Sequence, residues 1–221
     1  MLSIKSVPHK HSEFKYDKTQ HPYLVMKNIQ KEYPNAVFKL AVYERPGYGH
    51  DRYFFIQPGD NLETSLADFF DALAPNEELG LTSFVELHGE LGIEGTYHIP
   101  MIDFADGVSV DAVSKALGEI KKEIDAKFHV FETGRSYHAY IADLVTEKEW
   151  PIWLGNLLRL GSNKEPSVID TRWVGSALQR EFSTLRISCN TTVSKKIPLK
   201  IDIAPLMEDK LISSYKLISS Y

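Results

Sequence analysis

Hydrophobic residues recur at helical spacing in four segments of the chain. Residues 21–36 carry this spacing up to Pro34, which predicts a short helix because proline cannot continue one. Residues 61–78 predict a second helix, which begins at an Asn or Asp cap. Residues 109–128 show the clearest pattern, and residues 147–161 predict a fourth helix.

Strands are predicted where β-branched and aromatic residues concentrate. Residues 36–46 and 51–58 flank a Pro-Gly-Tyr-Gly-His turn at 46–50, which indicates two paired strands. Further strands are predicted near residues 83–90 and over residues 96–104. Because strands and helices intermix without a long βαβα run, we expect an α/β or α+β fold, with a mixed or antiparallel sheet covered by helices.

The chain is expected to form a single domain over residues 1–221, since no linker rich in Pro, Gly or Ser divides it. Within it we expect an N-terminal strand-helix unit over residues 21–94 and a catalytic-type unit over residues 95–204. The polar residues 1–20 predict a flexible arm. Residues 205–221, where KLISSY occurs twice in succession, predict a tail without chemistry.

Composition narrows the class of protein. A hydrophobic content of 43% is enough for a packed core, while one cysteine and the lack of a long apolar run favour a cytoplasmic protein with no membrane partner. The net charge of -5 argues against a protein that coats nucleic acid by charge alone. Residues 151–200, however, hold eight basic and three acidic residues, so this stretch could face a polyanion.

Three aspartates stand where apolar segments end. Asp103 follows an apolar strand, Asp106 lies three residues later, and Asp170 ends a second β-branched run. Carboxylates that converge from separate strand ends suit Mg²⁺ or Mn²⁺, which keeps waters and substrate phosphates as its other ligands. The alternative interpretation is a surface turn at Asp106, with Asp103 capping the following helix.

Donors suited to an anion occur at two further places. Gly134 permits a sharp turn, from which Arg135, Ser136 and His138 present donors at the start of a predicted strand. Arg186 lies on a later strand, and its guanidinium matches phosphate oxygens. An ordinary hairpin turn, capped by its serine, is the alternative interpretation of the first group.

The order of these residues resembles the archaeo-eukaryotic primase superfamily, and most closely its small, divergent primase 1D-like members. That family carries a strand-end acidic motif, a Ser-x-His after glycine, a lone Asp after an apolar strand, and a basic residue in a strand. The corresponding segments here are MIDFAD at 101–106, GRSYH at 134–138, VID at 168–170 and LRIS at 185–188. The resemblance covers about residues 95–200.

The resemblance implies a nucleotidyltransferase that makes or extends oligonucleotides on a single-stranded nucleic-acid template, with nucleoside triphosphates as substrates. Asp103, Asp106 and Asp170 would bind Mg²⁺ or Mn²⁺. Arg135, Ser136, His138 and Arg186 would bind the nucleotide at its phosphates. A partner protein is a further expectation.

The acidic motif departs from the family pattern. The family spaces its two acids i, i+2, which places both on one face of a strand, whereas Asp103 and Asp106 are spaced i, i+3. Either the strand breaks at Phe104 and a turn brings Asp106 back, or the site has fewer carboxylates. The second case predicts a catalytically degenerate module that binds nucleotide or single-stranded nucleic acid in a mobile-element or defence system. A metal-dependent phosphodiesterase is a third possibility.

Overall fold

The computed structural model describes residues 19–44, 52–89, 94–162, 167–191 and 196–203. Its helices are α1 (Tyr23–Glu32), α2 (Leu62–Asp71), α3 (Val110–Lys121), α4 (Trp150–Ser162) and α5 (Thr171–Arg180). Its strands are β1 (Ala36–Glu44), β2 (Arg52–Ile56), β3 (Glu77–Leu87), β4 (Gly95–His98), β5 (Met101–Asp103), β6 (Phe128–Glu132), β7 (Tyr137–Ile141), β8 (Val145–Thr146), β9 (Thr184–Arg186) and β10 (Leu199–Ile201). No helix in these ranges has the length and apolar character to cross a bilayer.

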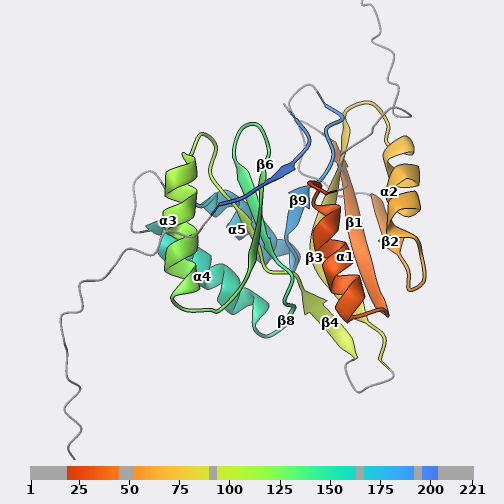
Figure 1. The fold of residues 1–221 in the computed structure, drawn as a ribbon, viewed down its shortest axis with the longest axis horizontal. Helices are drawn as coiled ribbons and strands as arrows, with labels where there is room; N and C mark the ends of the chain where they lie inside the picture. The colour runs from red at the N-terminus through yellow and green to blue at the C-terminus, as the bar shows by residue number, and fades with distance from the viewer. Residues whose placement is uncertain (1–18, 45–51, 90–93, 163–166, 192–195, 204–221) are drawn as a thin grey trace, which may run out of the picture.

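The strands form two antiparallel sheets. Sheet A has the order β2-β1-β3-β4-β8, and β9 pairs with β3 beside β4. Sheet B has the order β10-β6-β7-β5. Figure 1 shows α1 and α2 next to sheet A, and α3 and α4 next to sheet B. The fold is therefore α+β with helices covering antiparallel sheets, as the sequence predicts.

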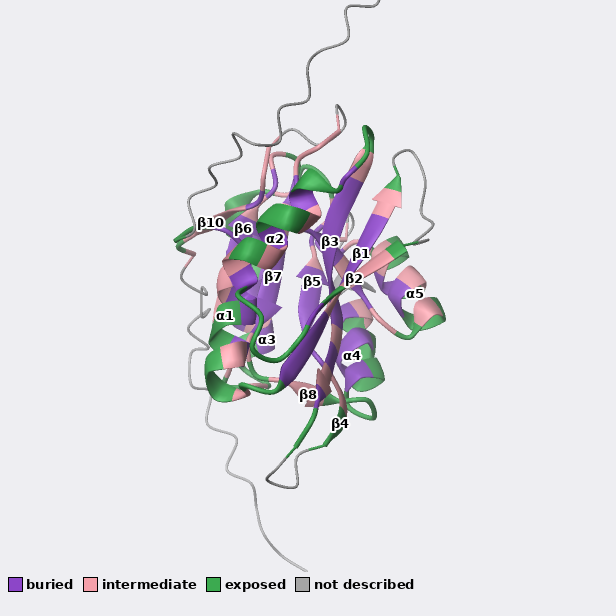
Figure 2. Ribbon diagram, turned by 90° about the vertical axis from the view of Figure 1, so that its right-hand side faces the viewer, coloured by how far each residue is buried: buried purple, intermediate pink, exposed green. Residues whose placement is uncertain are grey.

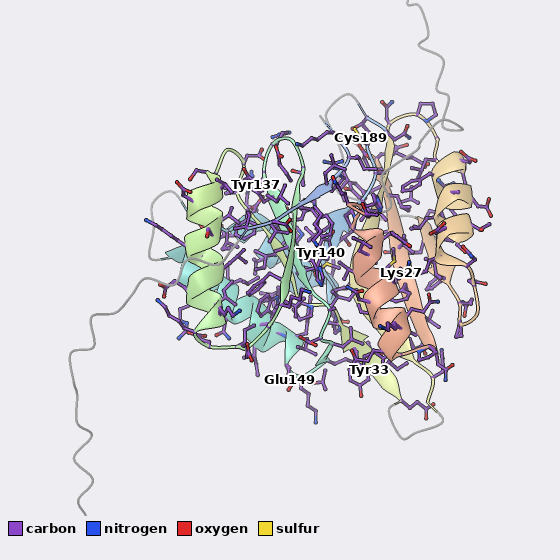
Figure 3. The ribbon with its side chains drawn as sticks, viewed as in Figure 1. Lys27, Tyr33, Tyr137, Tyr140, Glu149 and Cys189 are labelled. Carbon is purple, nitrogen blue, oxygen red and sulfur yellow. The ribbon has the colours of Figure 1, made fainter. Side chains whose placement is uncertain are left out.

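Side-chain alternation along sheet B divides the interior into two cores. Phe131 and Tyr140 point to one face and pack with sheet A, α1 and α2. Val130 and Ala139 point to the other face and pack with α3, α4 and α5. Figure 2 shows β1, β3, β5 and β7 largely buried, and Figure 3 shows Tyr140 in the middle of the molecule. Sheet B is thus covered on both sides, by sheet A, α1 and α2 on one face and by α3, α4 and α5 on the other.

The four predicted helices are confirmed, as is the pairing of the strands within residues 36–46 and 51–58. Asn61 caps α2 by accepting from Glu63 N and Thr64 N, and Ser109 caps α3. The turn at 46–50, most of the arm and the tail lie outside the described residues.

One sequence expectation is wrong, and one helix was not predicted. The single strand predicted over residues 96–104 is two strands in different sheets, since β4 ends before Ile99-Pro100 and β5 begins after it. Proline has no N–H to continue the ladder, so the chain changes sheets there. Helix α5 was not predicted, because Asp170 follows apolar residues and was interpreted as a strand end. It is instead the N-cap of α5.

A buried histidine links α1 to the strand that carries Arg186. His21 Nε2 lies 2.7 Å from Ile187 O, and Nδ1 accepts from Tyr23 N at 3.1 Å. Only the neutral ring, with its proton on Nε2, satisfies both contacts. Burial lowers the pKa of His21 to about 4, although the hydrogen bond to Ile187 acts in the opposite direction. Burial also lowers the pKa of His98 to about 4.

Because the pKa values of these two buried histidines are lowered, we expect acid to destabilise the fold. The unfolded chain takes up a proton at each histidine near pH 6.5, whereas the folded chain does so only near pH 4, so stability falls as pH decreases between these values. We expect each histidine to reduce the free energy of unfolding by about 2 kcal/mol between about pH 7 and pH 5. Urea unfolding at both pH values measures this loss.

The matched variants are His98→Gln and His88→Gln. The first removes one of the buried titrating rings and should shrink the pH-dependent loss by about 2 kcal/mol. The second removes a half-exposed ring and is the comparison for a histidine substitution outside the two buried sites. Equal pH dependence in His98→Gln and the unsubstituted chain would contradict the assignment.

Candidate functional site

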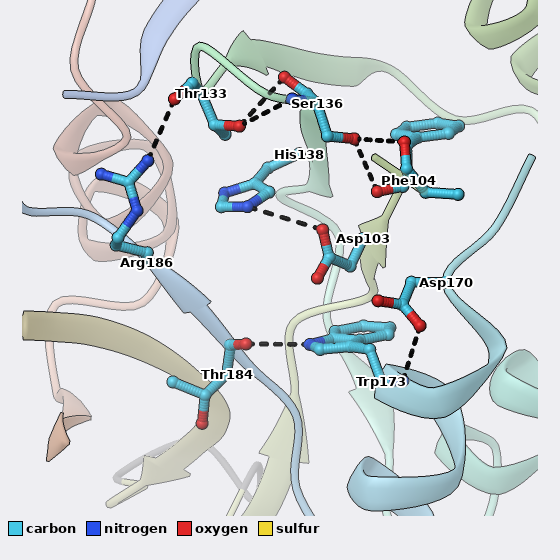
Figure 4. Close-up of polar contacts among 10 residues, drawn as sticks. Asp103, Phe104, Thr133, Ser136, His138, Asp170, Trp173, Thr184 and Arg186 are labelled. Atoms are coloured by element: carbon cyan, nitrogen blue, oxygen red, sulfur yellow. Dashed lines mark hydrogen bonds and ion pairs between the residues drawn. The ribbon is translucent and has the colours of Figure 1, made fainter. Parts of the chain in front are cut away.

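The pairing of β5 with β7 brings Asp103 and His138 together. They are directly opposed in the antiparallel register, so their side chains lie on one face of sheet B. His138 Nε2 lies 3.6 Å from Asp103 Oδ1 (Figure 4). His138 is buried, while the Asp103 side chain keeps 24% of its surface exposed. The carboxylate is therefore held by the fold at a position that solvent and a ligand can reach.

Asp170 lies opposite Asp103 on a neighbouring segment. Phe104 and Ile169 form an isolated antiparallel bridge, and Asp170 N donates to Asp103 O at 2.9 Å. Phe104 and Ile169 both point into the core beneath α3, α4 and α5. Their neighbours Asp103 and Asp170 therefore point the other way, with Cβ atoms about 5 Å apart for directly opposed residues.

The two carboxylates suit a hard divalent cation. Asp170 Oδ1 accepts from Arg172 N at 3.0 Å and from Trp173 N at 3.2 Å, which caps α5. The second oxygen of Asp170 points toward Asp103 in Figure 4. Two partly exposed carboxylates that leave room for water match the ligands that Mg²⁺ and Mn²⁺ take. Asp103 and Asp170 therefore fit a cation site.

Asp106 is directed to a different partner. It forms an ion pair with Arg135 on the surface, and Gly107 N donates to Arg135 O at 3.0 Å. An exposed pair of this kind contributes about 0–1 kcal/mol. Across the described ranges, no group of three or more His, Cys, Asp and Glu side chains is arranged to hold a metal ion. A metal-binding role for Asp106 stays a prediction.

Ser136 holds the segment that follows Asp103. Gly134 has a φ of 88°, so the chain turns sharply there, and Thr133 N donates to Ser136 O at 2.9 Å. The Ser136 hydroxyl lies 2.6 Å from Phe104 O and 2.9 Å from Ala105 O, and donates to this pair of carbonyls. Ser136 is buried, so its contacts are with the protein. Phosphate binding by Ser136 stays a prediction.

Replacing Ser136 with Ala is expected to destabilise the fold by about 1–3 kcal/mol, because two carbonyl groups beside Asp103 lose their buried donor. Thermal unfolding of the variant measures the effect. Unchanged stability together with a raised KM for nucleotide would contradict this prediction, and would assign the hydroxyl to the substrate instead.

Arg186 ties the two sheets together beside the site. Its Nη2 donates to Thr133 O at 3.2 Å, and its Nη1 donates to Lys196 O at 3.0 Å and to Ser188 O. Within the described part of the chain, Arg186 forms no ion pair with a carboxylate. A buried guanidinium whose charge is balanced only by carbonyl dipoles adds positive potential that favours phosphate.

Three residues of this region were not among the predicted site residues. Tyr140 is fully buried, and burial, followed by the charge of Asp103, raises the pKa of its hydroxyl well above the usual range. Trp173 donates from Nε1 to Thr184 O at 2.9 Å, and the Arg172 side chain is 89% exposed beside Asp170. The sequence could have indicated Tyr140, because it lies two residues after His138 on the same strand and alternation puts both side chains on one face of the sheet.

Comparison with protein families gives a match over more than half of the chain. The model of a family described as archaeo-eukaryotic primase 1D-like matches residues 58–199. This match includes Asp103, the GRSYH segment, Asp170 and Arg186. Neither a curated protein nor a solved structure shows a significant match.

Proposed function

Because the chain belongs to the archaeo-eukaryotic primase 1D-like family, we propose that it is a nucleotidyltransferase of the primase-polymerase type. It uses a divalent cation to synthesise or extend an oligonucleotide on a nucleic-acid template. The observation that carries this proposal is the opposition of Asp103 and Asp170, through Asp170 N–H and Asp103 O, on the face that points away from α3, α4 and α5.

Each residue of the site has a proposed task. Asp103 and Asp170 hold the cation, and Mg²⁺ or Mn²⁺ would supply Lewis-acid stabilisation of the charged phosphoryl oxygens. His138, next to Asp103, presents an imidazole to the phosphates of the nucleoside triphosphate. Arg186 adds positive potential from the opposite sheet.

The hairpin at Gly134 keeps these groups in place. Ser136 fixes the carbonyls that follow Asp103, and the ion pair of Arg135 with Asp106 closes the outer side of the same turn. Groups held in position before the substrate binds need no reorganisation during the reaction, so their electrostatic contribution is larger than in water. Arg135 is also the exposed cation of this group and can contact an incoming nucleotide.

The second candidate function is a catalytically degenerate module that binds nucleotide or single-stranded nucleic acid. The pairing of Asp106 with Arg135 favours it, because this pairing leaves two carboxylates at the site. A site with a single weakly bound cation can hold a triphosphate without efficient transfer.

The experiment that separates the two functions is incorporation of labelled nucleotide on a primed single-stranded template, with Mg²⁺ or Mn²⁺ and with a chelator as control. We expect metal-dependent extension. Nucleotide binding without any product, in either metal, would favour the degenerate module, and shortening of the oligonucleotide would favour a phosphodiesterase.

A further inference from the structure

One face of sheet A gathers aromatic rings around a lysine. Lys39 on β1 is opposed to Phe55 on β2, and Ala41 is opposed to Tyr53, so alternation places Lys39, Tyr53 and Phe55 on the same face. Phe38, Leu40 and Val42 alternate with them and pack in the core that includes α1 and α2. The face with Lys39 is therefore the one opposite these helices.

The rings surround the Lys39 ammonium. Its Nζ lies 4.1 Å from the ring centroid of Tyr53, 4.6 Å from that of Phe182 and 5.6 Å from that of Phe84. Phe55, opposed to Lys39 on the neighbouring strand, is 47% exposed, so its ring is open to solvent. We call Lys39, Tyr53, Phe55, Phe84 and Phe182 the aromatic face.

Within the part of the chain that the structure describes, no carboxylate pairs with Lys39. Among the described residues, none of the ion pairs with Asp or Glu includes Lys39. A cation held over rings by cation–π contacts keeps its charge available to a phosphate. The aromatic face thus combines flat apolar surfaces with a positive charge.

The aromatic face continues into the site. On β9, Thr184 and Arg186 are opposed to Thr82 and Gly80 of β3, and Gly80 is opposed to Ala41, so they share the face of Lys39. Phe182 lies two residues before Thr184.

Contacts along α5 complete the connection. Thr184 O accepts from Trp173 Nε1 at 2.9 Å, and Trp173 N donates to Asp170 at 3.2 Å. Figure 4 shows Thr184, Trp173 and Asp170 in this succession beside Asp103. Two hydrogen bonds therefore connect Thr184, two residues after Phe182, to Asp170 beside Asp103.

We propose that the aromatic face binds the single-stranded nucleic-acid template, with bases stacked on Phe55 and Tyr53 and a phosphate on Lys39. The chemistry favours this occupant because every base has a flat face that stacks on an aromatic ring, while a lysine binds the backbone without reading sequence. A duplex keeps its bases stacked on one another and offers no such faces. This inference rests on the proposed function.

The test measures fluorescence anisotropy of a labelled oligothymidylate of about 20 nucleotides, a length that spans several stacked bases. Phe55→Ala and Lys39→Met are each expected to weaken binding by about 10-fold, while Phe55→Trp keeps the ring and the affinity. Ile152→Ala removes another exposed apolar side chain, on α4, and serves as the matched control.

The outcomes test the aromatic face as the binding surface separately from the proposed nucleotidyltransferase function. Equal affinity of Phe55→Ala, Lys39→Met and the unsubstituted chain would overturn the aromatic face as the binding surface, while metal-dependent extension by the same preparations would leave the proposed function standing. If the unsubstituted chain neither binds the oligonucleotide nor extends it, the proposed function fails. Competition by duplex as effective as by single strand would also overturn the inference.

Discussion

Asp103→Asn and Asp170→Asn are each expected to lower nucleotide incorporation by about 100-fold or more, with little change in stability. The amide has the size of the carboxylate but no negative charge, so it is a poor ligand for a hard divalent cation. Loss of a group that stabilises transition-state charge typically costs about 100-fold to 1,000-fold in rate. Steady-state incorporation at saturating Mg²⁺ or Mn²⁺ measures the loss.

The choice of Asn at position 170 separates metal binding from helix capping. Asp170 caps α5 through Arg172 N and Trp173 N, and Asn caps a helix about as well as Asp. Asp170→Ala removes the cap as well, at a cost of about 1 kcal/mol. We therefore expect Asp170→Asn and Asp170→Ala to lose similar activity, while only the second lowers the melting temperature.

Asp106→Asn completes this series. The Asp106 side chain is exposed and pairs with Arg135, so we expect a loss of activity much smaller than in Asp103→Asn. A loss as large as that of Asp103→Asn would make Asp106 a third ligand. Full activity in both Asp103→Asn and Asp170→Asn would remove the metal site, and with it the proposed mechanism.

Glu78→Ala is expected to destabilise the fold by about 3 kcal/mol. Glu78 is fully buried in β3, and its carboxylate accepts from Asn190 N at 3.0 Å, Thr191 N at 3.2 Å and Thr191 Oγ1 at 2.9 Å, and from Ser188 Oγ. Each buried hydrogen bond to a charged group contributes about 1.5–3 kcal/mol, and donors left without an acceptor add to the loss. The expected loss of stability is smaller than the sum of these terms, because water can enter the space left by the Glu78 side chain and bind some of the donors.

A lowered melting temperature is the measured effect. At about 2–4 °C for each kcal/mol in a chain of this size, the shift is about 6–12 °C. Glu86→Ala is the matched control, because Glu86 lies on the same strand with a half-exposed side chain and a weak contact to His88 at 3.9 Å. It should change stability by less than about 0.5 kcal/mol.

The Glu78→Ala substitution should also affect Arg186 in the candidate site. Ser188, which donates to Glu78, accepts from Arg186 Nη1 through its carbonyl oxygen. Releasing residues 188–191 therefore loosens the guanidinium that joins β9 to the hairpin at Thr133. A Glu78→Ala protein that melts as the unsubstituted chain does would show that this carboxylate is dispensable.

Local sequence was sufficient for most of the elements. The spacing of Val113, Leu117 and Ile120 predicts α3, and each of these side chains is buried against sheet B. Local sequence was not sufficient where the same residue type is equally common in two kinds of structure. Asp170 suits a strand end as much as a helix cap, and only its contacts with Arg172 N and Trp173 N decide for the cap.

By itself, the sequence determined α1 to α4, the pairing of β1 with β2 and the kinds of side chain that stand at their ends, because these depend on neighbours within a few residues. Tertiary structure alone decided that Asp103 faces Asp170 and His138, that Asp106 turns to Arg135, and that the rings of β2 meet Lys39. Those pairings depend on strand register and on packing between segments far apart in the chain, which no local pattern encodes.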